Sequence, residues 1–142
     1  MNNIDFSKYN LKSTPSRKLI IEVLSSAISP MSADDIFLKA KAINNNINLS
    51  TIYRALDLFT SKHIINKILI ENDGKYFYSL ETKEHKHYFI CKTCKEITTL
   101  DSCPFEEYEE KMEDDYGFKI MSHNFELYGI CKKCLKENRN VI

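Results

Sequence analysis

Two Cys-x-x-Cys pairs carry the clearest chemical signal in the sequence: Cys91 with Cys94 and Cys131 with Cys134, with 36 residues between the pairs. Two residues between thiolates let both sulphurs reach one ion from a tight turn, and two such turns supply the tetrahedral S4 set that Zn²⁺ prefers. Redox dithiols are the alternative use of this spacing. We find no signal-peptide pattern and no apolar run of membrane-spanning length, so we expect a cytoplasmic protein with reduced thiols and no membrane partner. The pattern therefore predicts a structural zinc ion held by these four cysteines.

A second group of residues has the types needed for a weaker metal site. His85, His87 and His123 are three of the four histidines, and alternation in an extended segment turns His85 and His87 to one face. With Glu106, in the first turn of an expected acidic helix, they make an N3O set suited to Zn²⁺, Fe²⁺ or Mn²⁺. Solvated histidines and a glutamate that completes a helix N-terminus are the alternative interpretation.

The fifth cysteine, Cys103, stands outside both Cys-x-x-Cys pairs and precedes Pro104 at the expected start of the acidic helix. A helix N-terminus favours a thiolate through its dipole. Three interpretations follow: an extra ligand beside Glu106, a redox switch, or a small half-buried residue before a helix.

Three helices are expected in the first half, from apolar residues at helical spacing over 16–28, 32–43 and 50–62. Thr14, Ser32 and Ser50 are the expected N-caps. Two apolar runs follow, over 64–71 and 75–80. They are joined by Asn72-Asp73-Gly74, which predicts a β-hairpin.

The second half is expected to contain strands at 88–91, 96–100 and 119–128, with an acidic helix over 104–116 that ends at Gly117. Residues 1–80 carry ten Lys/Arg against seven Asp/Glu, and residues 81–142 carry ten against thirteen. The fold class is therefore α+β: a winged helix-turn-helix over 1–80, whose basic excess suits a polyanion, and an α/β domain with a zinc knuckle over 81–142.

The motifs together resemble the ferric uptake regulator family along essentially the whole chain. The matching segments run as follows: Leu11-Lys-Ser-Thr-Pro-Ser-Arg17, Ser32-Ala-Asp-Asp-Ile36, Ser50-Thr-Ile-Tyr-Arg54, His85-Lys-His87, the two Cys-x-x-Cys pairs, Tyr116-Gly-Phe118, His123 and Leu127-Tyr-Gly129. The resemblance implies a homodimeric, cytoplasmic repressor that binds double-stranded operator DNA when metal is bound, with residues 81–142 as its dimerisation domain. It also implies that His85, His87, Glu106 and His123 hold a regulatory Zn²⁺ or Fe²⁺.

The resemblance also implies a DNA-binding surface on the third helix, which would enter the major groove. Thr51 and Tyr53, with Ser50 beside them, would meet bases or phosphates. Arg54 would meet a phosphate or the domain's own acidic groups, and Arg17 would meet the backbone or minor groove. Core packing is the alternative role of Tyr53, since its position borders the buried stripe of the helix.

The sequence departs from the family at a further regulatory site between the domains. None of the residues at its positions is a convincing ligand: Pro30, Ser79, Lys86, Tyr88 and Thr99. Glu81, Asp101 and Cys103 lie close by and could substitute. We therefore expect a regulator of metal uptake or homeostasis, with zinc slightly favoured over iron, and not an enzyme. The alternatives are a peroxide- or redox-responsive regulator of the same family, a zinc-dependent thiol oxidoreductase, and a zinc-ribbon module without a sensing role.

Overall fold

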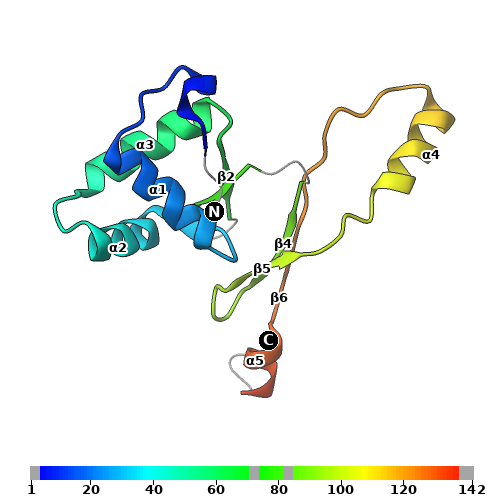
Figure 1. Cartoon of the computed structure of the whole chain (residues 1–142). Helices are drawn as coiled ribbons and strands as arrows, with labels where there is room; N and C mark the ends of the chain where they lie inside the picture. The colour runs from blue at the N-terminus through cyan, green and yellow to red at the C-terminus, as the bar shows by residue number, and fades with distance from the viewer. Residues whose placement is uncertain (1–3, 71–73, 82–84, 138–142) are drawn as a thin grey trace. The chain divides into compact units, whose positions relative to one another are not determined.

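The computed structural model describes residues 4–70, 74–81 and 85–137, and the chain divides into two compact units, Met1–Thr82 and Lys83–Ile142 (Figure 1). Its helices and strands are mixed in both units, as the α+β expectation requires. No helix in these ranges is long and apolar enough to cross a membrane.

The first unit is built on three helices: α1 (Pro15–Ser26), α2 (Ala33–Ile43) and α3 (Leu49–Ser61). The predicted caps of the first two are confirmed, because the Thr14 and Ser32 hydroxyls each accept a backbone N–H in the first turn of the helix. The prediction for the third is wrong. Asn48, not Ser50, caps α3 through its side-chain oxygen, which accepts the Thr51 N–H at 2.9 Å. A 3-10 turn over Phe6–Tyr9 precedes them, and its Phe6 ring stacks on Phe59 of α3.

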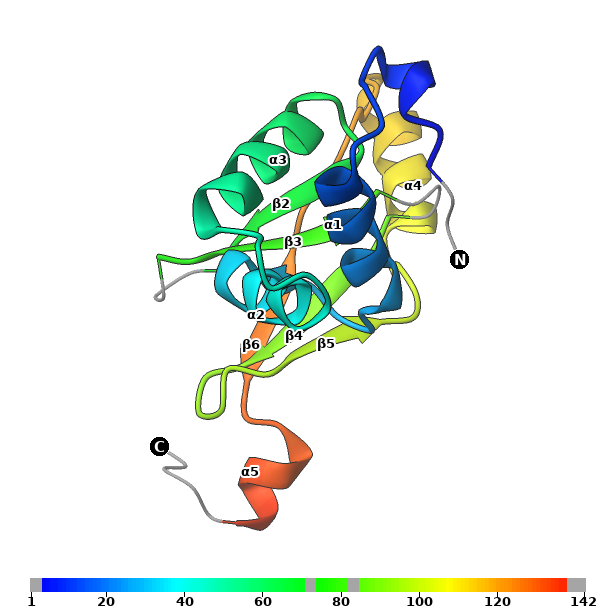
Figure 2. The ribbon, with the colours of Figure 1, turned by 60° about the vertical axis from the view of Figure 1, so that its left-hand side comes forward.

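A three-stranded antiparallel sheet in the order β1-β3-β2 completes this unit, and α1, α2 and α3 gather against it (Figure 2). The predicted hairpin is β2 (Ile65–Leu69) with β3 (Tyr76–Leu80), in a register that pairs Ile65 with Leu80. Asn72 and Asp73 of the predicted turn lie outside the described residues. β1 (Met31–Ser32), which the sequence did not predict, pairs with β3. Three helices followed by this hairpin are the winged-helix order.

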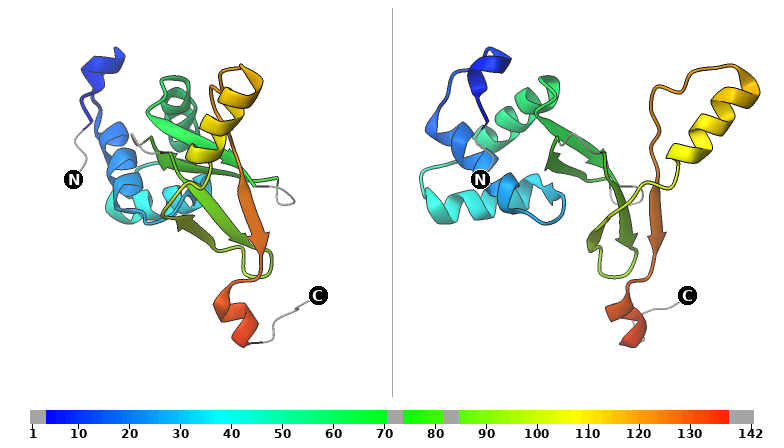
Figure 3. Two further views of the ribbon diagram at one scale, coloured as in Figure 1. Left: turned by 90° about the vertical axis from the view of Figure 1, so that its right-hand side faces the viewer. Right: turned by 45° about the vertical axis from the view of Figure 1, so that its right-hand side comes forward.

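The second unit contains a sheet in the order β5-β4-β6, in which the three strands run side by side (Figure 3). β4 (His87–Cys91) pairs antiparallel with β5 (Ile97–Leu100) and parallel with β6 (Glu126–Gly129). Gly129 leaves room for the Phe89 ring in this pairing, since a Cβ there would lie 3.2 Å from the ring. The strand predicted over 119–128 is wrong before residue 126, because β6 begins only at Glu126.

The second unit also contains two helices, one between β5 and β6 and one after β6. The acidic helix α4 (Glu106–Tyr116) begins two residues later than predicted, and Gly117 ends it in a left-handed conformation with φ 73°. A short helix, α5 (Lys132–Lys136), carries Cys134 and was not predicted. No residue of α4 is buried within this unit.

Candidate metal centres

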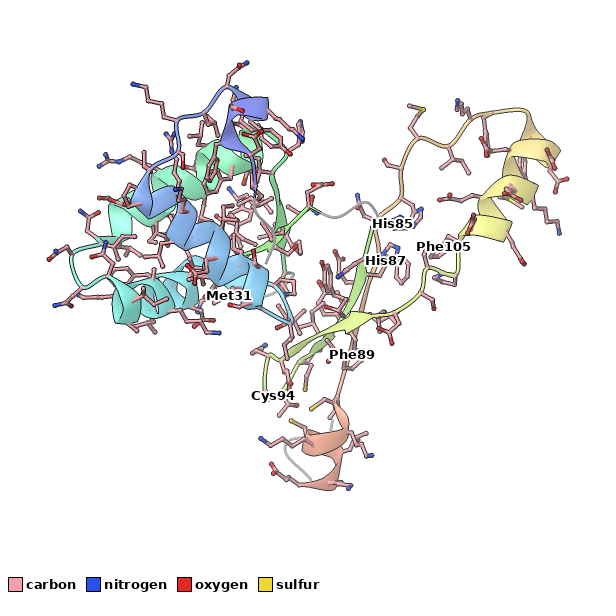
Figure 4. The ribbon with its side chains drawn as sticks, in the orientation of Figure 1. Met31, His85, His87, Phe89, Cys94 and Phe105 are labelled. Carbon is pink, nitrogen blue, oxygen red and sulfur yellow. The ribbon has the colours of Figure 1, made fainter. Side chains whose placement is uncertain are left out.

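One strand pair positions two groups of potential metal ligands. β4 begins at His87 and ends at Cys91, and its parallel register sets Tyr88 opposite Glu126 and Cys91 opposite Gly129. The segment before β6 therefore brings His123 toward His87, and the segment after β6 brings Cys131 toward Cys91. Figure 4 shows the two ends: the labelled His85 and His87 lie at one, and Cys94 lies at the other.

The four cysteines of the two Cys-x-x-Cys pairs meet at the Cys91 end. Their sulphurs all lie within 4.8 Å of one another, with 3.8 Å from Cys91 Sγ to Cys134 Sγ and 3.7 Å from Cys94 Sγ to Cys131 Sγ. A tetrahedral Zn²⁺ with Zn–S bonds of about 2.3 Å has sulphur–sulphur edges of about 3.8 Å. The thiol cluster thus fits a zinc ion with little movement, and a closed S4 set of this kind is structural.

The polypeptide stabilises the charged form of one of these thiols. Burial raises the pKa of Cys91, but the backbone N–H groups of Cys94, Cys131 and Thr93 outweigh it and lower that pKa to about 6. The first two N–H groups donate to Cys91 Sγ at 3.5 and 3.4 Å. Burial raises the pKa of Cys134 to about 12, so this thiol needs a bound cation to ionise at neutral pH.

The second group gathers at the other end of β4 and centres on one nitrogen atom, His123 Nε2. Three atoms surround this nitrogen: His85 Nε2 at 3.1 Å, His87 Nε2 at 3.0 Å and Cys103 Sγ at 3.2 Å. The four ligand atoms all lie within 4.8 Å of one another. A neutral imidazole nitrogen has one lone pair or one proton, so it makes one good hydrogen bond and not three. Three neighbours at one corner are instead the arrangement of four ligands around an ion.

The outer nitrogens of two rings fix which nitrogens face the centre of this group. His123 Nδ1 contacts Glu109 Oε1, and His87 Nδ1 lies 3.3 Å from the Phe125 carbonyl oxygen. Because an ionised carboxylate and a carbonyl only accept, both Nδ1 atoms donate, and in the neutral rings that bind a metal both Nε2 atoms present lone pairs. Two lone pairs 3.0 Å apart repel each other unless a cation lies between them. This carboxylate–histidine arrangement is typical of metal-binding histidines.

Burial supports the same protonation state at His87. Its side chain is 4% exposed and stacks on Phe125 with ring centroids 3.9 Å apart. Burial is the main cause that lowers the pKa of His87, and His123 and His85 lower it further, against a smaller opposing effect of the Phe125 carbonyl. The neutral ring that metal binding requires is therefore favoured before any ion arrives.

Among the four residues expected at the second site, the structure brings together the three histidines and leaves Glu106 out. Glu106 is exposed in the first turn of α4, and Cys103 takes the fourth place in the group. Glu109, one turn further along α4, is the carboxylate that contacts His123, and sequence reasoning missed it. The sequence reasoning placed a carboxylate of this helix at the site but assigned Glu106, which lies three residues before Glu109. Neither Glu81 nor Asp101 joins a group of potential ligands in the described part of the chain.

Comparisons with known proteins show the family of this chain. Residues 8–128 match the ferric uptake regulator family. The chain belongs to this family. It is 32% identical to the ferric uptake regulation protein of Bacillus subtilis, with 94% of this chain and 95% of that protein covered. It is 29% identical to the peroxide operon regulator of the same species, with 89% and 86% covered. A solved structure of the Francisella tularensis ferric uptake regulator with iron is similar at a TM-score of 0.79 and 27% identity, with 94% of this chain and 99% of that one covered.

Proteins of the ferric uptake regulator family are metal-responsive transcription regulators. The exposure and contacts of the residues expected to bind DNA are therefore relevant to function. Tyr53 and Arg54 are exposed on α3, and Tyr53, at 44% exposure, is not a core residue. The Ser50 and Thr51 hydroxyls donate to Asn48 Oδ1 at 2.7 and 2.9 Å at the start of this helix. Arg17 is half-buried and its guanidinium donates to the Lys12 carbonyl at 2.7 Å. Their contacts with DNA stay a prediction.

Proposed function

We propose that this protein is a homodimeric repressor that binds operator DNA when a metal ion, zinc rather than iron, occupies the histidine site beside β4. One observation carries the proposal: three potential ligands converge on His123 Nε2 while the Nδ1 atoms of His87 and His123 hold their protons outward. Such a site is pre-organised for a cation. Imidazole ligands suit both Zn²⁺ and Fe²⁺, but Zn²⁺ generally binds nitrogen ligands more tightly than Fe²⁺ or Mn²⁺ does, which favours zinc control of metal uptake or homeostasis genes.

Two exposed surfaces support this proposal, one suited to DNA and one suited to a second copy of the chain. α3 presents Tyr53 and Arg54 to solvent, in the position of a recognition helix after the helix pair α1–α2. In the second unit, Tyr116, Phe118 and Met121 are 70%, 51% and 84% exposed. Exposed apolar residues of this size, together with an unburied α4, favour a second copy of the chain as the partner of this surface.

The proposed coupling is a shift between orientations of the DNA-binding units. His85 and His87 stand at the start of the second unit, directly after the boundary at Thr82. Metal binding fixes this segment against His123, which restricts the orientations open to the first unit. A dimer restricted in this way presents its two recognition helices about one DNA turn apart, the spacing of a palindromic site. The free energy available to shift the orientations equals the difference between the free energies of metal binding to the restricted and to the unrestricted state.

The test compares DNA binding of the wild-type protein, His123→Ala and the control His63→Asn. His63 lies in the first unit with φ 59°, a conformation that Asn tolerates. Binding sites are first selected from a random DNA duplex library with zinc present, and affinity is then measured with and without added Zn²⁺, Fe²⁺ or Mn²⁺. We expect zinc to tighten DNA binding at least tenfold for wild type and the control.

For His123→Ala the same zinc response is lost, while the zinc content of the cysteine site, the circular dichroism and the dimer mass stay unchanged. A metal response that survives in this variant refutes the sensing site. DNA binding by the wild-type protein that is indifferent to metal refutes the proposed function as a whole and favours a zinc-ribbon module without a sensing role.

A further inference from the structure

We propose that Cys103 is the fourth ligand of the histidine site, which makes it an N3S centre that selects zinc-class ions over Mn²⁺ and Fe²⁺. The inference concerns the site of the proposed function and rests on it only for its regulatory meaning. The sequence pattern assigned a glutamate to this place. A thiolate in the same place changes both the charge and the softness of the ligand set, and hence the metal it selects.

The position of the sulphur is that of a ligand. Cys103 Sγ lies 3.2 Å from His123 Nε2 and within 4.8 Å of the His85 and His87 ligand nitrogens. With a Zn–N bond of about 2.0–2.1 Å and a Zn–S bond of about 2.3 Å, a tetrahedral site has nitrogen–sulphur edges of roughly 3.5 Å. The observed edge differs from this by a few tenths of an ångström. A movement of that size lies within the reach of a cysteine side-chain rotation.

A simple S–H···N hydrogen bond from Cys103 explains the arrangement around His123 Nε2 less well than a bound metal ion does. The Nδ1 proton that His123 directs at Glu109 leaves one lone pair on Nε2, and His85 and His87 already lie 3.1 and 3.0 Å from it. A thiol donor would share that lone pair with two imidazoles, one of which also presents a lone pair. A single divalent cation satisfies all four atoms at once.

The segment that carries Cys103 is anchored at this place. It follows β5 and precedes α4, and the Phe105 ring packs on Phe125 and His123 with centroid separations of 4.9 and 5.4 Å. Figure 4 labels Phe105 on the segment that leads into α4. Phe125 in turn stacks on His87. The aromatic contacts therefore hold Cys103 over the histidines independently of any bond made by its sulphur.

The carboxylates of Glu106 and Glu109 are not placed to bind a metal ion at this site. Glu109 contacts the outer nitrogen of His123, on the far side of the ring from the ligand group, and Glu106 is exposed. Among the described residues, the group of potential ligands contains three imidazoles and one thiol, and no carboxylate. Three neutral imidazoles and one thiolate suit Zn²⁺ or Co²⁺, whereas Mn²⁺ prefers oxygen ligands and Fe²⁺ binds N/O/S sites more weakly than either ion.

Cobalt provides a direct readout, because a thiolate bound to Co²⁺ gives a sulphur-to-metal charge-transfer band that a nitrogen or oxygen ligand does not. The full-length dimer is first loaded with one Zn²⁺ per chain to fill the cysteine site, and Co²⁺ is then titrated while bound zinc is monitored. The variants are Cys103→Ser, Cys103→Asp and the matched control Glu106→Gln, which removes the carboxylate that the sequence predicts as a ligand.

We expect the second equivalent of metal to produce the charge-transfer band in wild type and in Glu106→Gln, with zinc retained, and Cys103→Ser to lack the band. Cys103→Ser should weaken Zn²⁺ binding at the second site by more than the roughly 10- to 100-fold typical of an outer-shell substitution. Its Mn²⁺ affinity should stay nearly constant. Cys103→Asp, which supplies a hard oxygen, should tighten Mn²⁺ binding relative to wild type.

Two results overturn the inference: a second Co²⁺ that binds wild type without the band, or a band and a zinc affinity that survive in Cys103→Ser. Both leave the proposed function intact if metal still promotes DNA binding. Conversely, a wild-type protein with the band but with metal-independent DNA binding supports the N3S centre and refutes the regulatory function. The spectroscopic and DNA-binding readouts therefore separate the two failures.

Discussion

Glu109 offers the sharpest test of how the histidine site is organised, because it supports a ligand without being one. Its carboxylate contacts His123 Nδ1, so it holds the Nδ1 proton, directs the Nε2 lone pair inward and adds negative charge near the bound cation. Glu109→Gln keeps an acceptor oxygen but removes the charge. Glu109→Ala removes both. The two variants thus separate the electrostatic contribution from the orientation of the ring.

The size of each effect follows from the geometry and exposure of the pair. Loss of an outer-shell partner typically weakens metal binding roughly 10- to 100-fold, or about 1.4–2.7 kcal/mol. The Glu109 and His123 side chains are 24% and 21% exposed, so solvent screens part of the charge effect. We therefore expect about a tenfold loss of zinc affinity for Glu109→Gln and a loss nearer 100-fold for Glu109→Ala.

The assay is a zinc titration in competition with a chelator, on dimer whose cysteine site is already filled, together with the free zinc concentration that gives half-maximal DNA binding. Glu106→Ala is the matched control, since it removes an exposed carboxylate from the same helix. Both midpoints should shift by the same factor for the Glu109 variants and stay constant for the control. A normal zinc affinity in Glu109→Ala, or a larger loss in Glu106→Ala, would contradict this account of the site.

Two further predictions concern the platform on which the site rests. Asn48→Ala should lower the free energy of unfolding of the first unit by about 1 kcal/mol in urea denaturation, because its side chain caps α3, whereas Ser50→Ala should change it much less. An equal loss in both variants would show that the cap is shared. Stripping zinc from His123→Ala, in which only the cysteine site holds metal, should speed amide hydrogen exchange across β4 and β6 while the helical signal of the first unit remains; unchanged exchange in these strands after complete zinc removal would show that the cysteine site does not hold their pairing.

The order of helices and strands follows closely from local patterns. The three helices and the hairpin of the first unit match periodicity and capping residues, because each signal lies within the element it defines. The misplaced cap of α3 has a local cause: Asn48 and Ser50 are both good N-caps, and the Leu49 between them gives no preference. β1 and α5 are too short to leave a periodic pattern, and both depend on contacts made elsewhere in the chain.

The two metal sites likewise differ in how far local sequence patterns could predict them. The spacing of the cysteines predicted their group, because each turn brings two thiols together whatever the rest of the chain does. The fourth partner of the histidines depends on a longer path. Whether Cys103, Glu106 or Glu109 reaches His123 is set by where the segment between β5 and α4 runs, and the packing of Phe105 on Phe125 determines that course. No spacing rule in the sequence contains this tertiary contact.

The parallel pairing of β4 with β6 gives the chelation prediction its physical basis. The pairing of Tyr88 with Glu126 and of Cys91 with Gly129 belongs to a single register, so a slip of one residue would displace both ligand groups together. Only four residue pairs hold that register, and the sheet has few buried residues beyond β4 itself. A zinc ion that joins the thiols after β4 to those after β6 fixes the register at one end. It thereby holds His123, three residues before β6, beside His87 at the other end, and the cysteine site becomes a condition for the histidine site.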